Sequence, residues 1–254
     1  MNKIKSLLYN YAIPVTGRIY KKKNSYINVI YYHDIVQGDA HGCQYMNVDT
    51  FKAQMEYLLK NGYKTYTFDQ LEEEDCLCFH PKSVLITFDD GWRSNYDEIF
   101  AYMKEKQLKY NIFLVADKIG KHEKYLDWDM VRQMYASGVV GFGAHTVRHV
   151  SMADPQMENY DFEINEANRI IEKELGFVPR DFCYPYGCYS TASNQYLVSN
   201  SVYKRIYTSD LRFSYPMEEK IIFGRNPINA DESFRVYKNK LKGNYNAVSK
   251  ILRR

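Results

Sequence analysis

Short β-prone runs alternate with helical patterns along most of this 254-residue chain, and that alternation constrains its fold more than any other feature. Strands that alternate with helices form parallel sheets, so the chain is predicted to be an α/β protein. Six or seven such units, with polar residues gathered just after the strand ends, indicate a closed or nearly closed barrel. The predicted strands include residues 28–32, 84–88, 111–116, 139–143 and 182–184. One large domain is expected rather than two small ones.

Composition narrows the classes of function. The net charge is only +3, and Lys and Arg are spread along the chain, so no nucleic-acid-binding surface stands out. We infer no obligate protein partner. The five cysteines (Cys43, Cys76, Cys78, Cys183 and Cys188) have a spacing that suits neither a disulfide framework nor a zinc knuckle. Free thiols in a reducing compartment are therefore expected.

The amino-terminal segment, residues 1–20, lacks the apolar core of roughly 7–15 residues that a signal peptide needs. No run approaches the ~20 apolar residues that a transmembrane helix requires. We therefore predict a cytoplasmic protein. A weak peripheral membrane contact through Ile4, Leu7, Leu8 and Ile13 stays open.

Two adjacent carboxylates end one of the predicted strands. The apolar run at residues 84–88 is followed at once by Asp89 and Asp90, and further along come His145 and His149, an i, i+4 pair. Two carboxylates and two imidazoles can hold one divalent metal ion with three ligands and leave one acid free as a base. Zinc is the metal first expected for such a donor set. The residues thus form a complete set of groups for metal-assisted hydrolysis.

Further polar residues follow other predicted strands. His33 ends the first strand, and the turn Pro185-Tyr186-Gly187 ends another. Taken singly, each feature has an ordinary structural explanation: Asp-Asp-Gly is a common turn, and a histidine after a strand is more often a core residue than a catalytic one. In a barrel, however, the carboxyl ends of all strands meet at one rim. Polar residues from four strand ends therefore indicate one functional site.

Three motifs in this order resemble those of a known family. Residues 87–92 read Thr-Phe-Asp-Asp-Gly-Trp, residues 145–149 read His-Thr-Val-Arg-His, and residues 184–187 read Tyr-Pro-Tyr-Gly. They resemble the first three motifs of the polysaccharide deacetylases, the family-four carbohydrate esterases that share the chitooligosaccharide-deacetylase homology domain. The resemblance extends over roughly residues 27–240, most of the chain.

The resemblance implies a distorted (β/α)7-type barrel in a single domain over residues 1–254, with residues 1–26 as an amino-terminal extension. It implies a metal-dependent hydrolase that removes acetyl groups from N-acetylhexosamine units of a glycan, oligosaccharide or glycolipid precursor. By position, Asp89 would be the general base, and Asp90, His145 and His149 would be the metal ligands. The backbone N–H of Tyr186 would help to stabilise the oxyanion.

Two departures from the family pattern concern the base and the acid. Many relatives have an arginine two residues before the motif proline, where it orients the catalytic aspartate, and this chain has Cys183 there. Many relatives also use a carboxyl-terminal histidine as the acid, and this sequence has no histidine after His149. The segment at residues 29–34, Val-Ile-Tyr-Tyr-His-Asp, resembles the first strand of the biofilm poly-N-acetylglucosamine deacetylases, whose acid is a histidine on that strand. We therefore predict that His33 is the acid, with a core role as the alternative.

Residues outside these motifs complete the predicted site. Trp128 is expected as an aromatic wall for a sugar ring, beside aspartates at 127 and 129 that can cap the next helix. A long helix is expected over residues 158–175 and a short strand over residues 221–223. Arg225 and the two residues after it would then follow this last strand and line the cleft.

Three hypotheses for function differ in class. The first is the deacetylase described above. The second is a catalytically weak or inactive carbohydrate-binding protein on the same fold, which the two departures favour and the intact ligand set opposes. The third is an unrelated barrel metallohydrolase with a His-x-His pair on its first strand, and the sequence contains no such pair.

Overall fold

Seven parallel strands close into a barrel in the computed structural model, which describes residues 26–73, 80–154, 159–212 and 214–246. The ring follows chain order, and its first strand pairs with both the second and the last. The strands of the ring are β1 (Asn28–Tyr32), β5 (Ser83–Phe88), β6 (Tyr110–Leu114), β7 (Val140–Ala144), β8 (Asp181–Cys183), β9 (Arg205–Thr208) and β11 (Lys220–Pro227). The predicted distorted (β/α)7-type barrel is thus confirmed.

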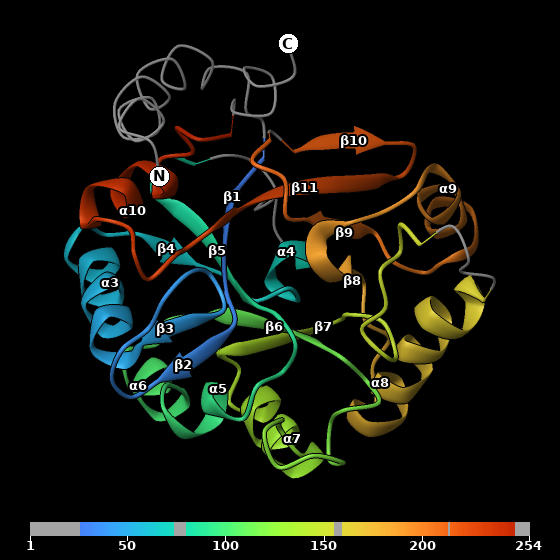
Figure 1. The fold of residues 1–254 in the computed structure, drawn as a ribbon, viewed down its shortest axis with the longest axis horizontal. Coiled ribbons are helices and arrows are strands. Elements are labelled where there is room, and N and C mark those ends of the chain that lie inside the picture. Colours follow the sequence, from blue (N-terminus) through green and yellow to red (C-terminus); the bar gives the residue numbers. More distant parts are fainter. Residues whose placement is uncertain (1–25, 74–79, 155–158, 213, 247–254) are drawn as a thin grey trace.

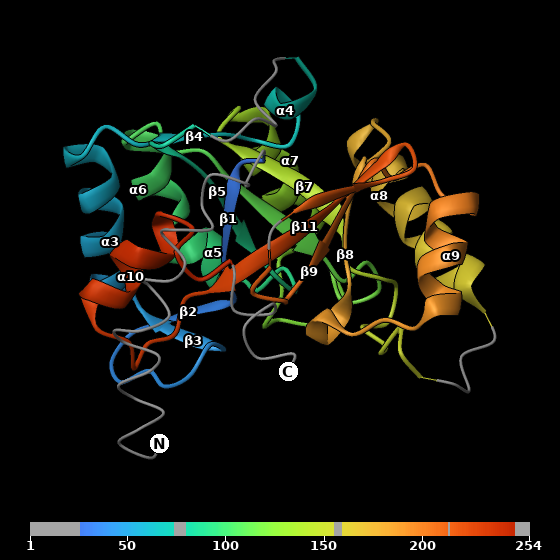
Figure 2. The same cartoon turned by 90° about the horizontal axis from the view of Figure 1, so that it is seen from above.

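Helices lie around the outside of the ring (Figure 1). They are α3 (Val48–Lys60), α5 (Ser94–Asp97), α6 (Phe100–Glu105), α7 (Trp128–Ala136), η3 (Phe162–Glu166) with α8 (Ala167–Leu175), α9 (Thr191–Asn200) and α10 (Phe234–Leu241). The short turn η4 (Pro185–Gly187) directly follows β8. The short helix α4 (Gln70–Glu73) and the strand pair β2 (Asp34–Val36) and β3 (Tyr45–Asn47) lie on opposite sides of the barrel (Figure 2). The remaining strands are β4 (Lys64–Thr65) and β10 (Tyr215–Met217), which pair with β5 and β11.

The ring is uneven around its circumference. β1 pairs with β5 over five residues, whereas β7 and β8 share only the pair Ala144 and Phe182. β4 takes the place beside the first half of β5, so β6 pairs only with the end of that strand. The amide of Asn111 fills the resulting gap by donating to Tyr66 O (2.9 Å) and Ile86 O (3.2 Å). This local opening is one source of the distortion.

Apolar and aromatic side chains fill the middle of the barrel. Phe113 contacts Tyr207 with ring centroids 5.0 Å apart, and Tyr207 stacks on Phe223 at the same distance. Phe68, from the segment before α4, packs against Phe113 at 5.1 Å and closes the amino-terminal end. Gly143 gives Phe113 its space, because a Cβ at that position would lie 2.8 Å from the phenyl ring. The interior is therefore a packed core of apolar and aromatic side chains.

Some element boundaries differ from the sequence prediction. The last strand is longer than the predicted 221–223, so Arg225 lies inside β11 rather than after it. The predicted helix over 158–175 contains the π-helical turn η3 ahead of α8. The strands β2 and β3 were missed because three residues each are too few to show a period.

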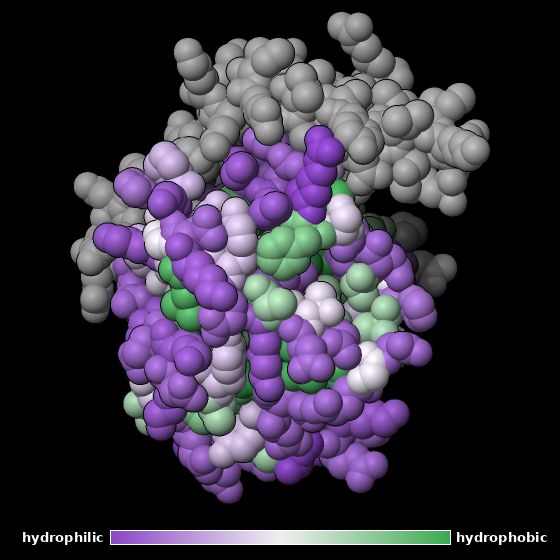
Figure 3. Space-filling model, turned by 90° about the vertical axis from the view of Figure 1, so that its left-hand side faces the viewer, coloured by the Kyte–Doolittle hydropathy of each residue, from purple (hydrophilic) through white to green (hydrophobic). Residues whose placement is uncertain are grey.

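The outer surface carries few large apolar side chains on the side of α3 and α10, where hydrophilic residues predominate (Figure 3). Leu59 and Phe234 are the exposed large apolar residues on these two helices. In the described part of the chain, no helix has the length and apolar character needed to cross a membrane. The predicted extension at residues 1–26, the single-domain prediction and the peripheral membrane contact stay predictions, since residues 1–25 lie outside the described ranges.

Candidate active site

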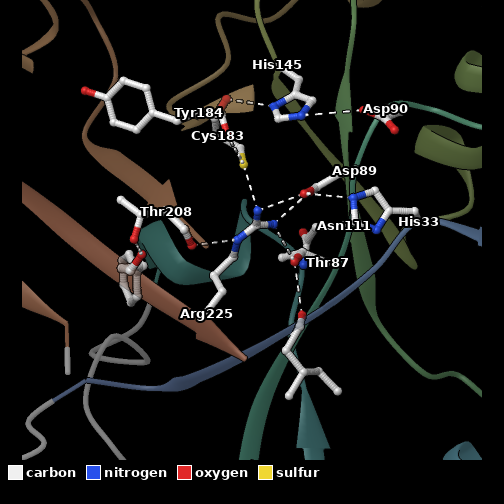
Figure 4. Close-up of polar contacts among 12 residues, drawn as sticks. His33, Thr87, Asp89, Asp90, Asn111, His145, Cys183, Tyr184, Thr208 and Arg225 are labelled. Carbon is white, nitrogen blue, oxygen red and sulfur yellow. Dashed lines mark hydrogen bonds and ion pairs between the residues drawn. The ribbon is translucent and has the colours of Figure 1, made fainter. Parts of the chain in front are cut away.

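The polar residues predicted to converge do lie together at the carboxyl-terminal rim of the barrel (Figure 4). Asp89 and Asp90 follow β5, and His145 follows β7. His33 follows β1, and the η4 turn follows β8. Because these strands are parallel, the chain delivers all of these groups to the same end.

Asp90, His145 and His149 form a compact group of potential metal ligands. One ligand atom from each lies within 4.8 Å of the other two. Asp90 Oδ1 is 3.1 Å from His149 Nε2 and 3.6 Å from His145 Nε2. This oxygen is buried and accepts no well-aligned hydrogen bond within the described ranges, whereas Oδ2 accepts the indole N–H of Trp92 at 3.0 Å. Two imidazole nitrogens facing an unsatisfied carboxylate oxygen fit a divalent metal of the zinc type.

The tautomer of His145 suits a metal ligand. Its Nδ1 lies 2.7 Å from the carbonyl oxygen of Cys183, so Nδ1 carries the proton and Nε2 presents a lone pair. Burial lowers the pKa of His145 to about 4, and the nearby charges of Asp89 and Asp90 only partly oppose this shift. The imidazole is therefore neutral near pH 7, as metal binding requires. Burial acts to raise the pKa of Asp90, but the imidazoles of His149 and His145 that face its carboxylate outweigh burial and lower that pKa, so Asp90 is ionised.

The rim holds several residues in the left-handed backbone region. Asp90, Thr146, His149 and Tyr186 have φ values of 74°, 63°, 63° and 59°. They are four of the six non-glycine residues with positive φ in the described ranges. Non-glycine residues in this region are strained and are held there by surrounding structure. Their concentration at one rim is typical of a functional site.

A buried carboxylate on a neighbouring helix holds the turn between the two histidines. Glu163 Oε2 accepts the backbone N–H groups of Val147 and Arg148, both at 3.1 Å, and Oε1 accepts Arg148 Nε at 2.5 Å. Glu163 is 1% exposed and lies in the π-helical turn η3, a form that often occurs at functional sites. Sequence reasoning missed this residue because the segment was predicted as a regular helix.

A second group of potential ligands shares His145 and consists of Asp89, His145 and Cys183. The guanidinium of Arg225 lies between two of its members. Arg225 Nη2 is 2.8 Å from Asp89 Oδ2 and 2.9 Å from Cys183 Sγ. A cation beside a fixed guanidinium would meet like-charge repulsion. The first group is therefore the better candidate metal site.

Arg225 is fully buried and forms a two-pronged ion pair with Asp89 (Figure 4). Nη1 donates to Oδ1 at 2.7 Å, parallel to the bond from Nη2 to Oδ2. Burial acts to raise the pKa of Asp89, but the charge and hydrogen bonds of Arg225 outweigh it and lower that pKa below its usual value.

The prediction that Arg225 and its two neighbours line a cleft after the last strand is wrong for Arg225 and Asn226. Both are fully buried in β11, and the amide of Asn226 donates to Asn28 Oδ1.

His33 lies next to Asp89 at the same rim. Its Nε2 is 3.8 Å from Asp89 Oδ2, and its Nδ1 is 2.9 Å from the carbonyl oxygen of Cys43. The imidazole side chain is 11% exposed, and its ring centroid lies 5.6 Å from that of Tyr31 in a T-shaped arrangement. One ring nitrogen is thus tied to the backbone while the other faces the carboxylate.

Aromatic side chains border the ligand group. Tyr186 is 65% exposed, and its ring lies 4.7 Å from that of His149. Trp92, which donates to Asp90, stacks on Tyr125 with centroids 4.7 Å apart. Trp128 is the first residue of α7, and Asp127 caps this helix. The indole of Trp128 packs against the hydrophobic core and lies near Gly120. Its predicted role as a wall for a sugar ring stays a prediction.

Known proteins resemble this chain over much of its length. A family model described as polysaccharide deacetylase matches residues 77–203, half of the chain. The poly-beta-1,6-N-acetyl-D-glucosamine N-deacetylase of Staphylococcus epidermidis is 22% identical over 185 residues, covering 68% of this chain and 61% of that protein. The chain spans about 60% of the length of the first curated relatives that it matches.

Solved structures share the fold. IcaB from Ammonifex degensii superposes with a TM-score of 0.73 at 23% identity, covering 85% of this chain and 97% of that one. The deacetylase PplD of Streptococcus pyogenes, in complex with acetate, gives a TM-score of 0.72 at 18% identity, covering 86% and 99%. At these identities the two superpositions establish a common barrel.

Proposed function

This chain belongs to the polysaccharide deacetylase family, and from that premise we propose that it is a metal-dependent hydrolase of acetyl groups on N-acetylhexosamine units. The proposed substrate is a glycan, an oligosaccharide or a glycolipid precursor, and N-acetyl groups are preferred. Relatives named for poly-beta-1,6-N-acetyl-D-glucosamine support this substrate class. The observation that carries the proposal is the unsatisfied oxygen of Asp90, which faces two imidazole nitrogens beside Asp89 and His33.

Asp90, His145 and His149 are the residues that would hold one divalent metal ion, and zinc is proposed from the donor set. Such a metal, when bound, supplies Lewis-acid polarisation of the acetyl carbonyl. The protein around it fixes the ligands in advance. The carbonyl of Cys183 sets the tautomer of His145, and Trp92 occupies the outer oxygen of Asp90.

Asp89 is proposed as the general base and His33 as the general acid. Asp89 takes a proton from the water that attacks the acetyl carbon. Its pKa is low, so the carboxylate is ionised and ready to accept. His33 then donates a proton to the sugar nitrogen as the carbon–nitrogen bond breaks, which releases acetate and a free amine. The backbone N–H of Tyr186 is proposed to stabilise the oxyanion, and Trp128 stays the proposed sugar contact.

A carbohydrate-binding protein without turnover is the alternative. It was favoured by the absence of an arginine at position 183 and of a histidine after position 149. Arg225 and His33 lie beside Asp89, however, so neither absence leaves the carboxylate without a neighbour. The deacetylase is therefore the stronger proposal.

The direct test is to remove metals with a chelator, restore zinc, and measure acetate released from acetylated glycans, including β-1,6-linked N-acetylglucosamine oligomers. The His145→Ala, His149→Ala double variant should lose both stoichiometric metal and acetate release. His80→Ala, a change of an exposed histidine away from the rim, is the matched control and should keep both. Equal metal in the double variant would refute the ligand assignment. A zinc-loaded protein that releases no acetate from any substrate would favour the binding protein.

A further inference from the structure

The contacts of Arg225 fix its guanidinium from every side. Nε donates to the carbonyl oxygen of Thr208 at 3.1 Å, and Nη1 donates to Thr87 Oγ1 at 3.2 Å in addition to Asp89. The ring of Tyr31 lies 4.3 Å from the guanidinium carbon. The pair Arg225–Asp89 is therefore a planar fork that sets both the position and the plane of the carboxylate.

The place that Arg225 occupies adjoins Cys183. Nη2 of Arg225 lies 2.9 Å from Sγ of Cys183, and both atoms are buried at the top of the barrel interior. An arginine at position 183 would need the volume that this guanidinium fills, and it would bring a second positive charge against the first. A small side chain at position 183 is thus a condition for Arg225. The two positions can hold one guanidinium between them.

We propose that Arg225 is the positioning residue of Asp89 in this chain, and that it supplies from β11 the guanidinium that relatives supply from the position of Cys183. The inference rests on the proposed function of Asp89 as the base. A carboxylate offers about four acceptor sites, and the fork of Arg225 uses two of them. The others stay available toward His33 and the rim, so the fork can hold the base without blocking it.

The exchange of the arginine between the two positions tests this proposal. The proteins compared are the unaltered chain, Arg225→Met, Cys183→Arg, the double variant with both changes, and Arg225→Lys. Arg225→Met should lower kcat on the order of 10²-fold, with KM and zinc content nearly unchanged, because the base is misplaced but the ligands are not. Arg225→Lys should recover only part of the rate, because an ammonium lacks the two-pronged geometry. Cys183→Arg should also lower kcat, since two guanidinium groups would then need the same buried volume beside Asp89.

The double variant gives the decisive result. It should regain at least about tenfold in kcat over Arg225→Met, because the guanidinium again meets Asp89. Thermal unfolding of the same proteins provides a measurement that does not depend on turnover, and the double variant should unfold at a higher temperature than either single variant. Full activity in Arg225→Met, or a double variant neither faster nor more stable than the single ones, would overturn the proposal. If the unaltered protein releases no acetate, that result counts against the proposed function alone. The unfolding temperatures would still show whether an arginine at position 183 can replace Arg225.

Discussion

Among the described residues, two buried arginine–aspartate pairs lie in the barrel interior, one at each end, and they differ in what surrounds the carboxylate. Arg225 pairs with Asp89 at the carboxyl-terminal rim at 2.7 and 2.8 Å. Arg205 pairs with Asp181 at the amino-terminal end, through Nε at 2.7 Å and Nη2 at 2.6 Å. Both pairs are more than nine-tenths buried, so the ion pair itself does not distinguish the two ends.

The side chains around the two ion pairs distinguish the two ends of the barrel. Asp181 also accepts the hydroxyl of Tyr207 at 2.8 Å, and Arg205 donates to the carbonyl oxygen of Phe68 at 3.2 Å. These partners join β8, β9 and the segment before α4, which suggests a structural role at the closed end. Asp89 instead faces an imidazole, at 3.8 Å from His33 Nε2, and precedes a potential metal ligand. A buried ion pair thus indicates function only when groups that can transfer protons or bind metal adjoin it.

The largest expected effect is that of Asp89→Asn. The amide keeps the size of the carboxylate but cannot accept a proton as a base, so acetate release should fall about 10²–10⁴-fold. Zinc content should stay stoichiometric, because Asp90, His145 and His149 are unchanged. Acetate release and metal content are measured on the same preparation. Full turnover in this variant would show that Asp89 is not the base.

Asp181→Asn is the matched change at the opposite end. It removes the negative charge that pairs with the buried guanidinium of Arg205, and breaking a buried pair in this way costs about 3–5 kcal/mol of unfolding free energy. Chemical denaturation measures this loss. The value of kcat per folded molecule should be nearly that of the unaltered protein, since Asp181 lies at the first position of β8, at the opposite end of the barrel from the rim. A large loss of kcat without a loss of stability would erase the distinction between the two pairs.

A pH dependence of stability is expected from His145 at the rim. Its pKa in the folded, metal-free protein is about 4, below the value of about 6.5 in an unfolded chain. The unfolded state therefore binds more protons between these values, and stability is present above pH ~6.5 and is lost as the pH falls toward 4. The full loss is about 3 kcal/mol. Denaturation of chelator-treated protein between pH 7 and 4 should show this loss, and His145→Gln should reduce it. An equal loss in both proteins would assign the effect to other groups.

His33→Ala tests the acid at the rim. An amine leaves poorly without protonation, whereas the phenolate of an aryl acetate needs far less help. The variant should therefore lose roughly 10²-fold or more on an N-acetylated sugar and little on an activated aryl acetate, with zinc still bound. Both substrates are assayed side by side. Unchanged rates on both would make His33 a packing residue.

Much of the barrel could be predicted from the sequence because its strands are apolar runs that are followed by polar, glycine or proline residues. Residues 84–88 lie entirely within β5, and the carboxylates that follow reach the rim as expected. The spacing of His145 and His149 indicated a shared ligand site, and the two side chains do meet at Asp90. Local pattern suffices for such features, since parallel strands bring their carboxyl ends together without further information.

The partners of these residues could not be predicted in the same way. Arg225 is 136 residues from Asp89 in sequence, and its strand was predicted to end before it. A buried arginine interrupts the run of apolar residues, so the predicted strand ended before Arg225, the residue that contacts Asp89. The carboxylate of Glu163 was missed for a related reason: a π-helical turn shifts the register of a helix face.

The smallest expected effect concerns Glu163. Its buried carboxylate accepts two backbone N–H groups as well as an arginine side chain. Its bonds to Val147 and Arg148 hold the turn on which His149 lies in the left-handed region. Glu163→Gln weakens these charge-assisted bonds, so zinc affinity should fall about 10–100-fold while the fold persists. Arg148→Ala is the matched control, because it removes the ion pair between the two side chains and keeps both backbone bonds. Competition with a chelator of known affinity measures the change. If Arg148→Ala weakens zinc binding as much as Glu163→Gln, the side-chain pair rather than the backbone bonds positions the histidine turn.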